Sequence, residues 1–434
     1  MNTDELVSSE GTVKLSSSRV RTKAVPNIMC TMALIAIGCT PYLDYNVSNA
    51  VKLFLFILWL LSTAFIHVFT GREKGFNIVV GFSIFLALQL LYSIIGVSRE
   101  LVFFLANCHI YVIPVSIVYI YHYYNPREIK FLWIFLVIIF GVNLLDNIWM
   151  GMTQGEMVFR NTEERLATNA GSTSFVVGST LLIPILYIAT RKSQKRKTKI
   201  YLSLYTIALL YYISFLNTRA TSLIVFLFIV LGYFLIEISR EKPLSRTHLL
   251  FRLILILICV LFFASSVLNF FLDVFSDNVR MLSRIEDLSY IMSEGDLSQL
   301  DEGSLYIRSI LWMASINTFF GSFHNFLFGV GEVAMEMDVY SLLSHGVGNH
   351  SEFFDLAARY GIVGVLIFYY IIKNTWRFFV GLTKDEKMKN YLYVFLLGVL
   401  FMGFVNGLTK ALTTMLIIYF MLALTVILVE NKEI

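Results

Sequence analysis

Residues 349–370 read NHSEFFDLAARYGIVGVLIFYY, a polar and ionisable cluster that runs directly into an apolar stretch of membrane length. Charged groups next to a bilayer are costly, and where they occur they usually serve a function. Residues three or four apart share a helix face, so Glu352, Asp355 and Arg359 are expected on one face turned away from lipid. An alternative is equally open: Asn349 or Ser351 caps the helix, and the charges mark its contact with water.

The whole chain has the composition of a membrane protein. Of its 434 residues, 57% are hydrophobic and 15% are charged, and the mean hydropathy is +0.73. We therefore predict an all-α, polytopic integral membrane protein with about 12 transmembrane helices. The expected spans are 25–43, 51–70, 76–96, 101–123, 131–150, 173–190, 200–215, 221–238, 250–272, 352–372, 391–408 and 411–429.

Lysine and arginine indicate which connections are cytoplasmic. With the N-terminus inside, the inner segments hold 24 of the 34 basic residues, and RKSQKRKTK at 191–199 is the densest of them. Both termini are then predicted to be cytoplasmic. The expected order is a cytoplasmic tail at 1–24, about nine spans at 25–272, one long extracytoplasmic loop at 273–350 and about three spans at 351–434.

The sequence lacks the motifs that are typical of several classes of protein. The four cysteines, Cys30, Cys39, Cys108 and Cys259, all lie in expected spans and show no Cys/His metal spacing, so neither a disulfide framework nor a metal site is indicated. No phosphate-binding loop and no dinucleotide fingerprint occur, and no cofactor is expected. The net charge of +4 reflects the basic inner segments and does not indicate nucleic acid.

Arginines on the predicted outer side run against the general charge bias. Arg165 lies in RLATNAGS, and Arg219 lies in NTRATS, a short turn between two spans. A guanidinium binds diphosphate through a planar fork that is always charged, and we favour this role over contact with lipid phosphates. The long outer loop adds Arg280, Arg284 and Arg308.

The long outer loop also holds a segment near 303–320 in which apolar and polar residues interleave around Trp312. This pattern predicts an amphipathic helix at the outer membrane interface. FLFGVGEV follows it, and its glycines indicate a turn that returns the chain towards the membrane.

Four stretches follow one another in the chain. They are RLATNAGSTSF, NTRATSLIVFLFIV, RSILWMASINTFFGSFHNFLFGVG and GNHSEFFDLAARYGIVGVLIFYY. In this order they resemble elements of the bacterial O-antigen and capsular polysaccharide polymerases and their sister O-antigen ligases. The resemblance covers most of the chain after about residue 130, and it is specific only because all four stretches occur together. The order Asn349, His350, Ser351 and the presence of Arg359 depart from the family pattern and leave the identity of the base open.

The resemblance implies a glycosyltransferase of the bacterial inner membrane that uses no nucleotide sugar and no metal. Its donor would be a glycan on undecaprenyl diphosphate, and its acceptor a second lipid-linked repeat unit, so that O-antigen or capsular polysaccharide grows on the outer face. The five outer arginines would hold the diphosphate, and His350 or Glu352 would accept the proton of the acceptor hydroxyl. Membrane lipids, a chain-length regulator and a flippase are the further partners implied.

Two alternatives compete with a polymerase. An O-antigen ligase uses the same donor but transfers the glycan to lipid A core. The form HSEFFDLAARYG and the aromatic content of 15% favour the polymerase. A lipid-linked oligosaccharide flippase, or another transporter, should carry cations along a cavity within the spans, whereas the cations here gather at the outer ends.

Overall fold

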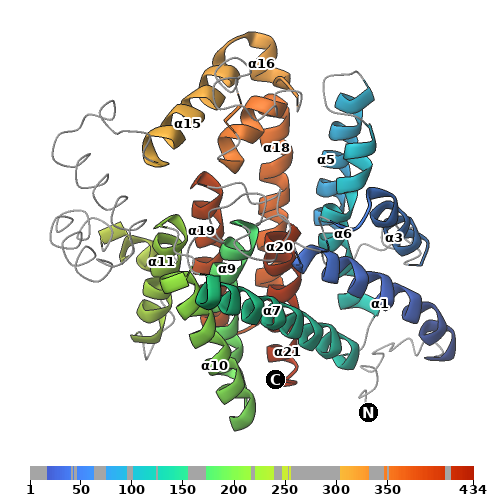
Figure 1. The fold of residues 1–434 in the computed structure, drawn as a ribbon, viewed down its shortest axis with the longest axis vertical. Helices are drawn as coiled ribbons and strands as arrows, with labels where there is room; N and C mark the ends of the chain where they lie inside the picture. Colours follow the sequence, from blue (N-terminus) through green and yellow to red (C-terminus); the bar gives the residue numbers. More distant parts are fainter. Residues whose placement is uncertain are drawn as a thin grey trace, which may run out of the picture.

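The structure is a computed structural model. It describes residues 17–40, 43, 46–62, 75–94, 101–123, 126–154, 173–216, 220–238, 247–252, 254–255, 304–331, 347–348, 351–405 and 412–434. Every element within these ranges is helical (Figure 1), which confirms the all-α fold class. Six of the described helices are long and apolar enough to cross a membrane. The chain is therefore a multi-pass membrane protein, whereas the predicted number of spans stays a prediction.

The helices before the long loop are α1 (Ser17–Cys39), α3 (Asn49–Ser62), α5 (Phe76–Ile94), α6 (Leu101–Tyr123), α7 (Pro126–Gln154), α9 (Thr173–Lys192), α10 (Arg196–Tyr211), the π-helical turn η2 (Tyr212–Leu216) and α11 (Ala220–Ile238). The later helices are α15 (Ser304–Phe320), α16 (Phe323–Phe328), α18 (Glu352–Gly381), α19 (Glu386–Val405), α20 (Leu412–Met415), η4 (Leu416–Met421) and α21 (Leu422–Glu430).

The last helical rod, α20–η4–α21, forms the centre of the bundle. Every residue from 413 to 428 is buried, and α1, α6, α7 and α9 pack around it. Thr413 Oγ1 donates a hydrogen bond to the carbonyl oxygen of Gly38 at 2.7 Å, and Trp133 Nε1 donates to Thr425 Oγ1 at 2.9 Å. Because lipid tails are as apolar as these side chains, close packing and interhelical hydrogen bonds hold such a rod in place.

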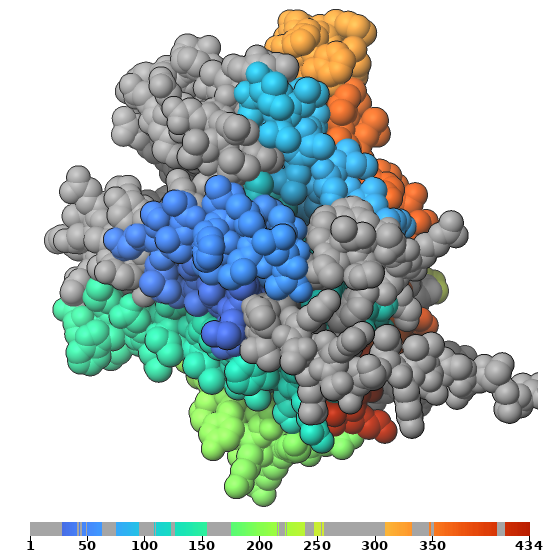
Figure 2. All heavy atoms as spheres, turned by 90° about the vertical axis from the view of Figure 1, so that its right-hand side faces the viewer, coloured from blue at the N-terminus to red at the C-terminus, as the bar shows by residue number. Residues whose placement is uncertain are grey.

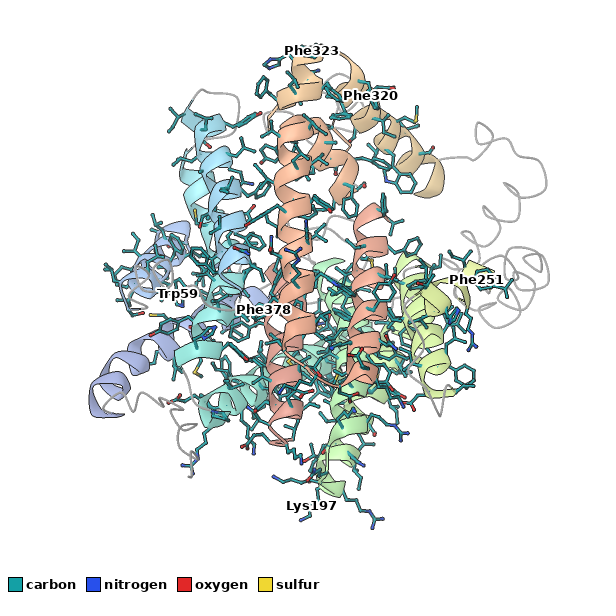
Figure 3. All side chains as sticks on the ribbon, turned by 180° about the vertical axis from the view of Figure 1, so that it is seen from behind. Trp59, Lys197, Phe251, Phe320, Phe323 and Phe378 are labelled. Carbon is teal, nitrogen blue, oxygen red and sulfur yellow. The ribbon has the colours of Figure 1, made fainter. Side chains whose placement is uncertain are left out.

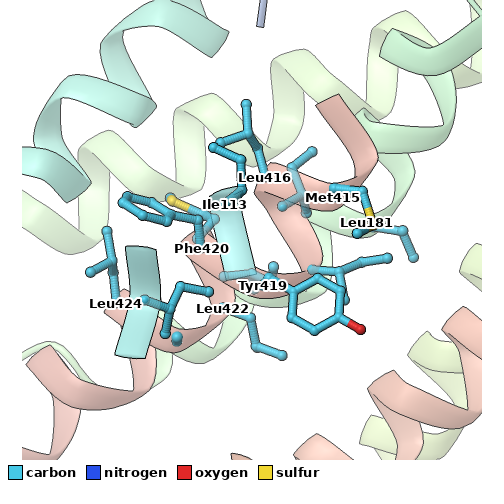
Figure 4. Close-up of a cluster of buried hydrophobic side chains, with 14 of the residues drawn as sticks. Ile113, Leu181, Met415, Leu416, Tyr419, Phe420, Leu422 and Leu424 are labelled. Carbon is cyan, nitrogen blue, oxygen red and sulfur yellow. The ribbon is translucent and has the colours of Figure 1, made fainter. Parts of the chain in front are cut away.

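The packing around this rod joins parts of the chain that are far apart in sequence. Figure 4 shows Ile113 of α6 and Leu181 of α9 beside Leu416 and Phe420 of η4 and Leu424 of α21. These five side chains are at most 1% exposed. The bundle is therefore organised around its C-terminal helix.

Acidic and basic side chains pair at one end of the bundle, which we call the basic end. Glu237 at the end of α11 accepts hydrogen bonds from Lys387 Nζ at 2.8 Å and from Arg191 Nη2 at 3.4 Å. Lys192 Nζ lies 2.6 Å from Asp385 Oδ2. Figure 3 shows Lys197 at the tip of this end. The segment 191–199 and the connection between the expected spans 352–372 and 391–408 are both inner segments of the predicted topology, and they thus lie on the same side of the molecule.

The pairing at the basic end keeps Asp385 ionised. Burial alone would raise the pKa of this carboxyl group, but hydrogen bonds from Lys192 and from the backbone N–H groups of Lys387 and Met388 outweigh it. The pKa of Asp385 therefore lies below its ordinary value, and its pair with Lys192 persists at neutral pH.

At the opposite end, which we call the capped end, α15 and α16 lie over the first turns of α18 (Figure 1). The end of α19 reaches the same place, because Ser351 Oγ donates to the carbonyl oxygen of Gly403 at 3.5 Å. α5 also ends here: Tyr92 Oη donates to the carbonyl oxygen of Phe328, and Figure 2 shows α5 rising along the flank of the molecule towards α16. The helix expected near 303–320 corresponds in position to α15.

Several helices are longer than the expected spans, and α7 and α18 show this most clearly. α18 starts at Glu352, as expected, but continues to Gly381 rather than ending near 372, and α7 runs from Pro126 to Gln154 rather than from about 131 to 150. Hydropathy marks where apolar residues stop, whereas a helix continues as long as its backbone hydrogen bonds do. Lys373, Asn374 and Arg377 are polar residues that extend α18 without breaking it.

Candidate active site at the start of helix α18

Three ionisable side chains are buried in the first turns of α18. Glu352 is 6% exposed, Asp355 2% and Arg359 7%. Their spacing predicts one common face, and the structure confirms that this face is turned into the protein. Ser351 is the N-cap, and its side chain accepts a hydrogen bond from the backbone N–H of Phe354 at 3.3 Å. The cap that the alternative proposed is thus present at Ser351, but the three charged side chains are buried and do not mark a contact with water.

A four-residue clasp connects α15 to the start of α18. Ser315 Oγ donates to Asp355 Oδ1 at 2.7 Å and accepts from the backbone N–H of Gly348 at 2.9 Å. Asp355 Oδ2 accepts from the backbone N–H of Ser351 at 3.2 Å. Both carboxylate oxygens of Asp355 therefore accept hydrogen bonds that hold α15 and the start of α18 together. The clasp also includes Gly348 and Ser351, the residues on either side of positions 349 and 350.

A glycine-containing strap, residues 329–331, crosses α18 where the helix is kinked. Gly361 has φ 61° and ψ −160° inside α18, and the kink frees carbonyl groups of the preceding turn. The backbone N–H of Val330 donates to the carbonyl oxygen of Ala358 at 3.0 Å, and that of Gly331 donates to that of Arg359 at 2.9 Å. The strap therefore replaces helical hydrogen bonds and fixes the turn that carries Arg359.

Only glycine fits at the two closest approaches of this strap. A Cβ atom on Gly329 would lie 2.2 Å from the carbonyl carbon of Arg359, and one on Gly361 would lie 2.4 Å from that of Leu327. Both glycines also have a positive φ, 75° and 61°, with ψ values in a region that is essentially restricted to glycine. Sequence reasoning missed this contact, although Gly329, Gly331 and Gly361 were visible signals of it.

Replacing Gly329 or Gly361 by alanine is expected to destabilise the protein by at least about 2 kcal/mol, because the new methyl group meets backbone atoms and the φ angle becomes strained. The apparent Tm of purified protein in detergent measures the effect. Gly381→Ala in the same helix is the matched control, since a Cβ atom there meets nothing within 4 Å. Equal Tm values for all three variants would contradict the assigned role of the strap.

A tyrosine network links the kinked part of α18 to the first half of the chain. Gln89 Nε2 of α5 donates to Tyr111 Oη at 3.0 Å and to Tyr360 Oη at 3.1 Å. The ring of Tyr360 also packs edge-to-face on Phe85 at 5.3 Å and on Tyr92 at 5.6 Å between centroids. These contacts fix the rotation of α18 about its axis and so keep the ionisable face inside. Sequence analysis did not single out any of these residues.

Helices α9, α11 and α18 all begin towards the capped end. α11 runs antiparallel to α19, because Gly232 faces Val394 and Gly398 faces Ile229, and Glu237 ends α11 at the basic end. α9 likewise ends at the basic end, with Lys192. The helices α9 and α11 therefore begin, at Thr173 and Ala220, at their ends that are farther from the basic end.

The structure describes the side chain of only one predicted site residue, Glu352. His350, Arg165, Arg219, Arg280 and Arg284 lie outside the described residues, and Arg308 lies in α15, where only its backbone is described. Arg219 directly precedes α11, and His350 lies one residue before the cap of α18. Within the described ranges, no group of three or more His, Cys, Asp or Glu side chains could hold a metal ion.

Residues 204–369 match the model of a protein family described as O-antigen ligase. This match, over 166 of the 434 residues, is consistent with the O-antigen polymerase and ligase family that the sequence resembles. The O-antigen ligase match begins in α10 and ends inside α18, so it includes the clasp, the strap and the buried ionisable face. The family indicates a membrane enzyme that transfers glycosyl groups in polysaccharide biosynthesis. The search of curated proteins found no match to the chain.

Proposed function

We propose that the protein is a membrane glycosyltransferase that joins oligosaccharide repeat units carried on undecaprenyl diphosphate. The observation that carries this proposal is the buried ionisable face of α18 at the capped end, inside the region matched by the family. α9, α11 and α18 all begin towards this end, and the sequence before each of them holds Arg165, Arg219 or His350. Three separate helices, α9, α11 and α18, therefore begin towards the end of the molecule at which the site is proposed.

The proposed reaction needs little besides fixed cations and a base. The oxygen of an acceptor hydroxyl attacks the anomeric carbon of the donor, the bond from that carbon to the diphosphate oxygen breaks, and the lipid diphosphate leaves with its negative charge. Arg165 and Arg219 stabilise that charge, while His350 or Glu352 takes the hydroxyl proton. No metal and no nucleotide sugar take part in this scheme.

The arginines of the long outer segment take a supporting role in the proposal. Arg308 is seven positions before Ser315 and three before Leu311 in α15, so all three positions lie on one face of that helix. Leu311 is 3% and Ser315 0% exposed, and this face packs towards α18 through the clasp. Position 308 is therefore on the site side of α15. Arg280 and Arg284 are assigned to diphosphate or glycan binding on their sequence context alone.

We further propose that the basic end lies in the cytoplasm of a bacterial cell and the capped end outside the inner membrane, since basic residues are retained inside. Gln194 in the α9–α10 connection and His324 of α16 are both exposed. In intact cells, a membrane-impermeant thiol reagent should label His324→Cys, and label Gln194→Cys only after permeabilisation. The unsubstituted protein is the control. The reverse labelling pattern would invert the topology and remove the proposed site from the outer face.

A ligase is the second candidate, and the description of the matched family favours it. The two activities differ only in the acceptor. Purified protein in vesicles would be given labelled lipid-linked repeat units together with lipid A core. The polymerase assignment expects the label in lipid-linked glycans longer than one repeat. Transfer of the label to lipid A core alone would identify a ligase instead.

A further inference from the structure

A pocket at the basic end has no place in the reaction proposed above. It lies between the start of α5 and the end of α18, and it is lined by Gly75, Asn77, Asn374, Arg377, Phe378 and Gly381. Its volume is about 190 Å³, more than tenfold the 10–15 Å³ or so that one water molecule needs by the same measure. The pocket can therefore hold a chemical group the size of a small anion.

The pocket is suited to a negatively charged group. Arg377 is exposed, and within the part of the chain that the structure describes it has no hydrogen bond or ion pair. None of the described lining residues is acidic. Asn374, which is 6% exposed, is held in place because its Nδ2 donates to the carbonyl oxygen of Tyr370 at 2.8 Å. The start of α5 adds backbone N–H groups and the positive end of a helix dipole.

The backbone at the pocket is shaped by glycine. Gly75 has φ 88°, and a Cβ atom there would lie 2.9 Å from Val118 and 3.0 Å from Phe378, so the chain enters α5 in close contact with α6 and α18. At Gly381 the opposite holds, because a Cβ atom would meet nothing within 4 Å. A side chain introduced at position 381 would therefore extend into open space beside Arg377.

An apolar path leads from the pocket along α18. Leu366 and Tyr370 precede Arg377 by eleven and seven residues, a spacing that puts all three on one helix face. Leu366 is 60% and Tyr370 36% exposed. The acyl chain of a lipid could lie along this face while the lipid head group occupies the pocket. Soluble phosphate has no acyl chain and would not contact this apolar face.

We propose that this pocket binds the phosphate diester head group of an anionic phospholipid in the leaflet at the basic end. Arginine–phosphate hydrogen bonds are charge-assisted and therefore strong, and basic pockets between helices on the cytoplasmic side are suited to anionic lipid head groups. An anionic lipid is favoured over a zwitterionic one because Arg377 is the pocket's only charged side chain among its described lining residues. The lipid holds α5 against α18 at the end opposite the proposed site.

Binding of phosphatidylglycerol and phosphatidylcholine to the purified full-length protein in detergent tests this proposal. We expect preferential binding of phosphatidylglycerol, and a rise in apparent Tm with its concentration because it binds the folded state. Arg377→Gln and Gly381→Leu should each weaken phosphatidylglycerol binding roughly tenfold, since one removes a charge-assisted hydrogen bond and the other fills the pocket. Arg377→Lys should keep part of the affinity. Lys197→Gln, an exposed basic residue of α10 at the same end, is the control and should bind as the unsubstituted protein does.

Three results would overturn the assignment. The first is equal binding of the two lipids. The second is a loss in Arg377→Gln no larger than in Lys197→Gln. The third is full stabilisation by inorganic phosphate without lipid, abolished in Arg377→Gln, which would make the occupant a soluble phosphate. If the Gly381→Leu variant does not fold, the proposal is tested by comparing the phosphatidylglycerol affinities of Arg377→Gln and Arg377→Lys. Lipid binding is measured without any glycan substrate, so the outcome does not depend on the proposed transferase activity.

Discussion

Replacing Arg219 by alanine is expected to abolish polymer while normal amounts of protein remain in the membrane. Arg219 directly precedes α11, whose start faces away from the basic end. In the proposed reaction its guanidinium stabilises the charge of the departing diphosphate. Loss of one such group typically lowers the rate by about 10²–10³. A gel of glycan lengths beside a membrane immunoblot measures both quantities.

The Arg219→Lys variant distinguishes the contribution of the positive charge from that of the planar shape of the guanidinium group. Lysine keeps the charge but lacks the two-pronged fork, so only partial recovery of polymer is expected. Arg196→Ala is the matched control, because Arg196 is an exposed arginine that also begins a helix, α10, but lies at the basic end. A normal glycan ladder from Arg219→Ala at normal expression would return Arg219 to contact with lipid phosphates.

Replacing His350 by alanine should stop chain growth and leave single repeat units on the lipid carrier. General base catalysis typically contributes 10²–10⁴-fold or so, and a loss of that size would remove the ladder. Glu352→Gln keeps the shape of a side chain that is 6% exposed and removes its charge. It should abolish growth equally if Glu352 is the base, and only slow growth if Glu352 orients the imidazole of His350.

Asp355→Asn is the control for a structural effect at the same helix start. Both carboxylate oxygens of Asp355 accept hydrogen bonds within the clasp, from Ser315 and Ser351. Weakening the clasp should lower the amount of folded protein more than it lowers the activity of each folded molecule. Stable His350→Ala protein with a normal ladder would exclude His350 and leave Glu352 as the candidate base.

Local features of the site could be predicted from the sequence, and contacts between distant segments could not. The common face of Glu352, Asp355 and Arg359 and the cap at Ser351 follow from helical spacing and capping chemistry alone. The strap on Gly361 depends on residues about thirty positions earlier, and the bond from Gln89 to Tyr360 spans 271 residues. Such pairings leave no periodic signal in a single sequence.

The long helices show a related limit. Hydropathy located α18 and α7 but misplaced the end of α18 and both ends of α7, because polar residues outside the apolar core continue a helix. The role of Asp355 was open for a different reason: a buried carboxylate at a helix start can serve chemistry or structure, and only its partners, Ser315 and Ser351, decide. The roles of Arg165, Arg219 and His350 remain predictions.

The most direct test of the proposed function is chain growth from a single purified component. The protein would be placed in vesicles with one lipid-linked repeat unit as donor and acceptor, together with a chelator and without nucleotide sugars. The account predicts a ladder of lipid-linked glycans, with one lipid diphosphate released for each new linkage, and no ladder from Arg219→Ala protein. Unchanged donor, or donor consumed only when lipid A core or a divalent metal is added, would contradict it.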